Sequence, residues 1–143
     1  MMIYLNGQDI NRIIFSILKE GAVEQDIVVN EIGPEGYLKA FRDFLEKNGC
    51  ELGEVKKIFA VVGPGSATAL RSSLAIVNTL GFAKGIGLVA VQKEKTEQDI
   101  DTINKLLEQG LSSFEIKNVL TPKYEHKPRI TISTKDALRR KAK

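Results

Sequence analysis

Residues 61–73 read VVGPGSATALRSS, and this stretch decides how the middle of the fold is built. An apolar run stops at Gly63-Pro64-Gly65, and a segment with helical spacing begins after Ser66. Glycine reaches backbone angles that other residues resist, proline fixes one dihedral, and a serine oxygen can accept a hydrogen bond from a free helix N–H. The pattern predicts a strand, a tight turn and a helix capped by Ser66.

The segments on either side of this turn predict a parallel pair of strands. Residues 58–62 and 88–91 are both short apolar runs, and residues 67–83 between them have helical character. A strand–helix–strand crossover of this kind places its two strands side by side and parallel.

The first third of the chain predicts an antiparallel meander followed by a helix. Strands are expected at residues 2–5, 10–18 and 27–32, with connections at Asn6-Gly7 and Gly21. A helix is expected over residues 35–48, ending at Gly49. Its apolar positions span an arc of roughly 160°. They are Tyr37, Leu38, Ala40, Phe41, Phe44 and Leu45.

Two further helices are expected after Gln92. The first begins near residues 96–99 and has apolar positions at Ile100, Ile103 and Leu107. The second starts at Ser112, where residues 112–115 have capping-box spacing, and reaches Val119.

Composition indicates one globular domain without membrane spans. The chain has 143 residues, of which 43% are hydrophobic and 27% charged. The single cysteine, Cys50, cannot form an internal disulfide, which fits a cytoplasmic location. The net charge is +3, yet residues 123–143 hold eight Lys and Arg against two carboxylates, so the body is weakly acidic and the tail basic. A solvated terminus explains the tail more simply than nucleic-acid binding does.

Catalytic and metal sites are not indicated by the residues. The Gly-Pro-Gly-Ser turn lacks the Lys-Ser/Thr ending of a phosphate-binding P-loop. Ser66 does not have the Gly-x-Ser-x-Gly spacing of a hydrolase nucleophile, and the only histidine, His126, lies in the tail. One Cys and one His far apart make no metal-ligand set. We therefore expect a protein that is not an enzyme and has no cofactor and no metal.

The helix after the turn predicts a protein interface instead. Its only charge before Lys84 is Arg71, and a stripe of Leu70, Leu74, Val77 and Leu80 is expected to pack on the sheet. The remaining surface is small or weakly polar, which is typical of an interface core. The expected contacts are Tyr37, Ala40, Phe44, Arg71, Ala75 and Asn78. The alternative is that the chain's own segments bury both helices.

The turn also resembles a known family. Gly63, Pro64, Gly65, Ser66, Thr68, Leu70 and Arg71 match the Gly-Pro-Gly-Ser-Phe-Thr-Gly-Leu-Arg signature of TsaB (YeaZ) proteins. The chain departs from it at Ala67, Ala69 and Ser73. The resemblance implies an α/β fold: the ribonuclease-H-like half of an actin-like ATPase fold, with a mixed five-stranded sheet and a reduced second half. Residues 1–121 would form this domain and residues 122–143 a basic tail.

The resemblance further implies a non-catalytic subunit that supports a TsaD-type enzyme in threonylcarbamoyladenosine modification of tRNA. Its partner would be the TsaD-type protein, with a homodimer when alone; whether the tail contacts tRNA stays open. Where the family's first strand runs Ile-Asp-Thr-Ser, this chain has Leu5-Asn6-Gly7-Gln8, so no nucleotide binding is expected there. Two alternatives are a stand-alone homodimeric module and, less favoured, a small nucleotide-binding enzyme of actin-like ancestry.

Overall fold

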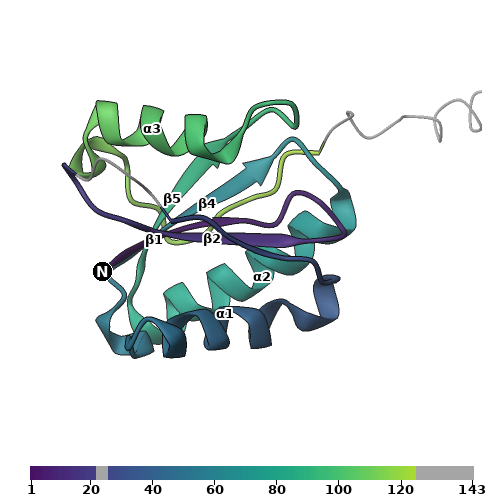
Figure 1. The fold of residues 1–143 in the computed structure, drawn as a ribbon, viewed down its shortest axis with the longest axis horizontal. Coiled ribbons are helices and arrows are strands. Elements are labelled where there is room, and N and C mark those ends of the chain that lie inside the picture. Colours follow the sequence, from purple (N-terminus) through teal and green to yellow (C-terminus); the bar gives the residue numbers. More distant parts are fainter. Residues whose placement is uncertain (22–25, 125–143) are drawn as a thin grey trace, which may run out of the picture.

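The computed structural model describes residues 1–21 and 26–124 and arranges them in three layers. A central sheet has two helices on one face, α1 (Tyr37–Lys47) and α2 (Ala67–Lys84), and one helix, α3 (Asp99–Gln109), on the other (Figure 1). Three single 3-10 turns, η1 (Pro34–Gly36), η2 (Leu52–Glu54) and η3 (Leu111–Ser113), join these elements.

The sheet has five strands in the order β3-β2-β1-β4-β5. Their bounds are β1 (Met2–Asn6), β2 (Ile13–Leu18), β3 (Val28–Asn30), β4 (Lys57–Gly63) and β5 (Gly87–Gln92). The first three strands form an antiparallel meander, and β1–β4 and β4–β5 pair in parallel. The mixed five-stranded sheet and its element order confirm the α/β architecture expected from the sequence.

Apolar side chains form one core on each face of the sheet. The core under α1 and α2 includes the stacked rings of Phe15 and Phe44, whose centroids are 5.1 Å apart. The core under α3 includes Phe59, which meets Phe114 edge to face. β4 contributes to both faces because its successive side chains alternate between them. Leu70, Leu74 and Val77 of α2 are buried as expected, whereas Leu80 is half-buried.

The turn between β4 and α2 has the expected cap. The Ser66 hydroxyl accepts a hydrogen bond from the Ala69 N–H at 3.3 Å, so Ser66 is the N-cap of α2. Gly63 has φ 135°, a backbone angle that residues with a Cβ rarely adopt. Gly65 lies directly against the backbone of Gln8, which leaves no space for a side chain.

One expected element is wrong, and several bounds differ. Residues 112–119 do not form an α-helix: after η3 the chain runs beside β5, where the Lys117 N–H donates to the Leu88 carbonyl. The packing of Phe114 on Phe59 and this edge pairing override the capping-box pattern. The predicted strand 10–18 begins only at Ile13, because residues 9–12 form a turn closed by the Arg12 N–H and the Asp9 carbonyl.

Most of the basic tail lies outside the described residues, since these end at Tyr124. Before that end, the Lys123 N–H donates to the Val62 carbonyl at 2.7 Å, so the chain passes the end of β4. Within the described parts of the chain, no helix combines the length and apolar character that crossing a bilayer requires.

Replacing Gly65 by alanine tests the close approach at this turn. A Cβ there would lie 2.7 Å from both the Cβ and the carbonyl oxygen of Gln8, and backbone cannot move aside as a flexible side chain can. Gly65→Ala should therefore lower the free energy of unfolding by about 2 kcal/mol or more. The matched control is Gly53→Ala, where a Cβ meets nothing within 4 Å and φ is not positive; it should change stability by less than about 0.5 kcal/mol. Chemical denaturation measures both, and equal effects would contradict the close-approach argument.

Candidate functional site

An apolar groove runs between α1 and α2 on their outer side. One hollow of about 290 Å³ is lined by Leu38 of α1 and by Ala75, Ile76, Thr79 and Leu80 of α2. A second hollow of about 380 Å³ shares Leu38 and Leu80 with it and continues past α1 to Cys50 and Leu52. We call these two hollows together the α1–α2 groove. Leu38 is 51% exposed although it is a large apolar residue, so the groove presents hydrophobic surface to the solvent.

The predicted interface residues divide into two groups. Tyr37, Ala40 and Phe44 are buried in the core under α1, so they face the sheet and a partner cannot reach them. This corrects the expected orientation of α1: its arc buries these three positions, and Leu38 is the apolar residue that remains outside.

The other three predicted positions lie on α2. Arg71 and Ala75 are exposed, and Ala75 lines the α1–α2 groove. Asn78 is half-buried and holds the Leu120 backbone on the other flank of α2: its Nδ2 donates to the Leu120 carbonyl at 3.0 Å, and its Oδ1 accepts from the Leu120 N–H at 2.7 Å. The predicted interface role of Arg71 and Ala75 stays a prediction.

The turn residues that match the family signature hold the ends of neighbouring strands together through hydrogen bonds. The Ser66 N–H donates to the Gln8 carbonyl at 3.0 Å, and the Gln8 amide donates to the Pro64 carbonyl at 2.7 Å. Gly63 also accepts from the Lys93 N–H at 3.0 Å. Thr68 is exposed on the first turn of α2. The turn thus joins the ends of β1, β4 and β5, and one of its N–H groups already has a partner within the chain.

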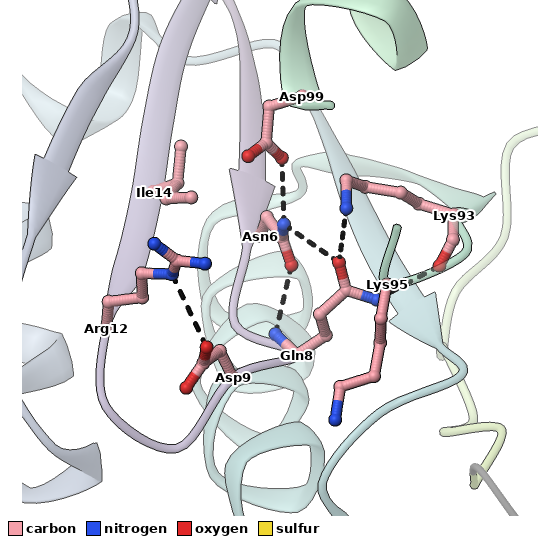
Figure 2. A pocket seen from close by; sticks show the side chains of 8 residues that line it. All are labelled: Asn6, Gln8, Asp9, Arg12, Ile14, Lys93, Lys95 and Asp99. Atoms are coloured by element: carbon pink, nitrogen blue, oxygen red, sulfur yellow. Dashed lines mark hydrogen bonds and ion pairs between the residues drawn. The ribbon is translucent and has the colours of Figure 1, made fainter. Parts of the chain in front are cut away.

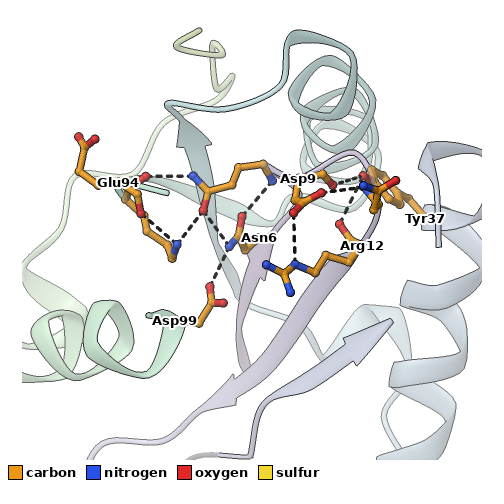
Figure 3. A network of polar contacts seen from close by, with 9 residues as sticks. Asn6, Asp9, Arg12, Tyr37, Glu94 and Asp99 are labelled. Atoms are coloured by element: carbon orange, nitrogen blue, oxygen red, sulfur yellow. Dashed lines mark hydrogen bonds and ion pairs between the residues drawn. The ribbon is translucent and has the colours of Figure 1, made fainter. Parts of the chain in front are cut away.

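A buried polar network occupies this same edge of the sheet. Figure 3 shows it running from Asp99, at the start of α3, through Asn6 to the segment after β5. The Asn6 amide donates to Asp99 Oδ1 at 2.8 Å and to Gln8 Oε1 at 3.1 Å. The Tyr4 hydroxyl donates to the same Asp99 oxygen at 2.6 Å. The Lys93 amine donates to Gln8 Oε1 at 2.8 Å and to the Glu94 carbonyl at 3.1 Å.

Burial shifts the pKa values of Lys93 and Tyr4 in this network and of the nearby Tyr37. Lys93 is only 4% exposed, and desolvation lowers the pKa of its amine because the charged form loses hydration. Desolvation, together with the Asp99 carboxylate, raises the pKa of Tyr4, so its hydroxyl stays protonated and acts as a donor. Tyr37, whose hydroxyl donates to the Asp9 carbonyl at 3.1 Å, has a pKa raised to about 12, chiefly by burial.

Sequence reasoning missed this network. The pattern of residues 6–8 predicts a strand end and a turn without carboxylates, whereas Asn6 and Gln8 are the centre of a buried hydrogen-bonded cluster (Figure 2). Lys93 gave no signal, because it begins a charged run, Lys93-Glu94-Lys95, of the kind that usually lies in solvent. The available signal was the pair of amides flanking Gly7, since amide side chains can donate and accept at once and so suit a buried turn.

Comparing the wild type with Lys93→Met measures how the contribution of Lys93 to stability depends on pH. The folded-state pKa of Lys93 lies below its unfolded value of 10.5. Between these two pKa values the unfolded state binds more protons than the folded state, so stability rises with pH. The contribution of Lys93 to stability should therefore increase toward pH 10.5. The difference in unfolding free energy, wild type minus Lys93→Met, should rise as the pH increases toward 10.5. Denaturant titrations at several pH values measure it; a flat or falling difference would show that Lys93 is not desolvated.

Comparisons with known proteins find similarity to the TsaD family model and to YeaZ structures. The sequence model of the family TsaD, tRNA N6-adenosine threonylcarbamoyltransferase, matches residues 35–96, a stretch that includes α1, α2, β4 and β5 but is less than half of the chain. No curated protein matches the chain. YeaZ from Pseudomonas aeruginosa is similar in structure, with a TM-score of 0.55, 26% sequence identity, and coverage of 64% of this chain and 43% of that one.

A second solved structure agrees with the first. It is described as an uncharacterized protein with similarity to peptidase YeaZ from Pseudomonas aeruginosa, and it has a TM-score of 0.55 and 26% identity, covering 64% of this chain and 42% of that one. The chain thus spans less than half the length of either structure. With the signature turn, the mixed five-stranded sheet and the similarity to YeaZ in both fold and sequence, the chain is TsaB-like and has the α/β architecture of the actin-like ATPase fold.

Proposed function

We propose that this chain is a non-catalytic binding subunit that docks a TsaD-type protein through the α1–α2 groove and so supports threonylcarbamoyladenosine modification of tRNA in the cytoplasm. The observation that carries the proposal is the groove itself: two hollows lined mainly by apolar side chains, on helices that lie within the stretch matched by the TsaD family model. Soluble proteins seldom leave such a surface in water, so a partner is the simplest explanation.

The groove suits a protein partner better than a small ligand. It is open and shallow, and Leu38, Ala75 and Ile76 give it few polar groups to orient a substrate. A small-molecule site normally combines an enclosed pocket with placed polar groups. Arg42 and Glu46 on α1 supply polar groups for a protein contact, and the exposed Arg71 lies one turn before Ala75 on α2.

The carboxylates beside the ends of the strands, Asp99 and Asp9, support a non-catalytic role. Asp99 accepts hydrogen bonds from Tyr4 and Asn6 on one oxygen, and Asp9 pairs with Arg12 at 3.4 Å. Carboxylates held in this way are engaged in building the fold rather than set beside a nucleophile.

A stand-alone homodimeric module is the second candidate. The same groove could receive the same groove of a second copy about a two-fold axis, because an isologous interface needs only one self-complementary patch. Ala75 and Thr79 are small and exposed, so another helix could approach α2 closely. The two candidates differ in the partner and agree on the surface.

A charge placed in the groove tests both. The chain and the TsaD-type protein of its own organism, mixed at tens of micromolar, should co-elute in gel filtration. Ala75→Glu should weaken that complex by about 2 kcal/mol or more, because the interface would bury an unpaired carboxylate. Ala75 is exposed, so the fold should persist, as circular dichroism would show.

The matched control is Asn104→Glu, which adds the same side chain to an exposed position of α3 on the opposite face of the sheet. It should leave complex formation unchanged. No co-elution by folded wild-type proteins would reject the tRNA-modification role, and a dimer of the chain alone that Ala75→Glu dissociates would then support the homodimeric module. Equal loss with both variants would reject the groove as the contact surface.

A further inference from the structure

Residues 115–124 run from the start of β5 to the end of β4, and we call them the strap (the yellow-green segment of Figure 1). Apart from one bridge to β5, they form neither helix nor strand. Near the start of the strap, the Lys117 N–H donates to the Leu88 carbonyl of β5 at 2.7 Å. Near its end, the Lys123 N–H donates to the Val62 carbonyl of β4 at 2.7 Å. The strap is therefore attached to the sheet through its backbone at both ends.

The middle of the strap is attached by a side chain of α2. The Asn78 amide donates to the Leu120 carbonyl at 3.0 Å, and the Asn78 side-chain oxygen accepts from the Leu120 N–H at 2.7 Å. One amide can make both bonds because it carries a donor and an acceptor. The two end attachments join backbone to backbone, so the attachment by Asn78 is the one that a substitution outside the strap can remove.

The strap buries little apolar surface of its own. Leu120 is 2% exposed and belongs to the core under α1 and α2, whereas Ile116 and Val119 are 46% and 61% exposed. A segment with few buried apolar contacts opens locally at a lower free energy than a central strand does. The buried side chain and the two bonds from Asn78 meet at the same residue, so the loss of one of them weakens the whole central attachment.

The strap also forms one wall of a hollow at the C-terminal end of α2. The hollow has a volume of about 400 Å³ and is lined by Ile116 and Lys117 of the strap, and by Phe82 and Ile86 on the opposite side. Phe82 is 91% exposed, so the hollow presents apolar surface to the solvent. No residue of the strap lines the α1–α2 groove. Movement of the strap would change this hollow and leave the lining of the groove in place.

We propose that the strap is a movable cover with Asn78 as its latch. It leaves α2 and the sheet as one unit, which exposes Leu120 and opens the hollow beside Phe82. Both latch bonds break in the same event because both are made to Leu120. Once Leu120 has left the core, the end attachments are single backbone hydrogen bonds to exposed segments, and they open with it. This device does not depend on the docking role proposed for the α1–α2 groove.

Amide hydrogen exchange of the full chain tests the proposal, followed by NMR under conditions where the rate reports the opening equilibrium. In the wild type, the Lys117 and Lys123 N–H groups should have opening constants within about threefold of each other, and both should exceed that of Ile103 in α3. Asn78→Ala should raise both constants by about tenfold or more, although the acceptors of these two N–H groups are untouched. Ile103 should not change, which separates opening of the strap from global unfolding.

The matched control is Thr79→Ala, at the next position of α2, where the hydroxyl donates to the Ala75 carbonyl of the same helix at 2.7 Å. Like Asn78→Ala, it removes a polar side chain and raises helix propensity, yet it should leave the Lys117 and Lys123 constants within about twofold of the wild type. Faster exchange confined to Leu120 in Asn78→Ala would overturn the proposal, because the three attachments would then open independently. Equal acceleration in both variants would overturn it as well.

The wild-type measurement keeps the proposal falsifiable if Asn78→Ala does not fold. Opening as one unit requires similar constants at the two ends of the strap. Lys117 and Lys123 constants that differ by more than about threefold would then overturn the proposal without any variant.

Discussion

The contact between Gly65 and Gln8 is the constraint from which the functional surfaces of this chain follow. The turn after β4 lies against the connection after β1 so closely that residue 65 has no space for a Cβ. Two hydrogen bonds fix this approach, one from the Ser66 N–H to the Gln8 carbonyl and one from the Gln8 amide to the Pro64 carbonyl, at 3.0 and 2.7 Å. Because Ser66 caps α2, fixing the turn also fixes where α2 starts. The position of α2 beside α1, and hence the groove between them, depends on this contact between the turn and Gln8.

The junction separates two surfaces of different chemistry. The α1–α2 face is apolar and open, whereas the ends of β1 and β5 beside Gln8 carry a polar network whose groups hydrogen-bond to one another. An apolar open surface favours association with a protein, and a buried network with its hydrogen bonds made inside the chain stabilises the fold. The docking proposal therefore rests on the α1–α2 face and not on the network beside Gln8.

The sequence was sufficient for the architecture because its strongest signals are local. The glycines of the turn, the Ser66 cap and the apolar runs of β4 and β5 each specify a conformation through nearby residues, and they placed the crossover correctly. The helix predicted for residues 112–119 is wrong because the local capping-box spacing competes with contacts from residues distant in sequence. These are the Phe59 ring and the Leu88 carbonyl. An apolar arc does not say which of its edges faces the sheet, which explains why the expected outward position of Tyr37, Ala40 and Phe44 is wrong. The buried state of Lys93 depends on Gln8, which is 85 residues away in sequence, so no local pattern could reveal it.

The central claim is that the α1–α2 groove is a docking surface for a TsaD-type protein, and amide hydrogen exchange of the chain with and without that protein tests it most directly. The account predicts slower exchange on mixing in α1 around Leu38 and in α2 from Ala75 to Leu80, with α3 unchanged as an internal reference. Slower exchange confined to α3, or a stable complex that leaves both groove helices unchanged, would contradict it.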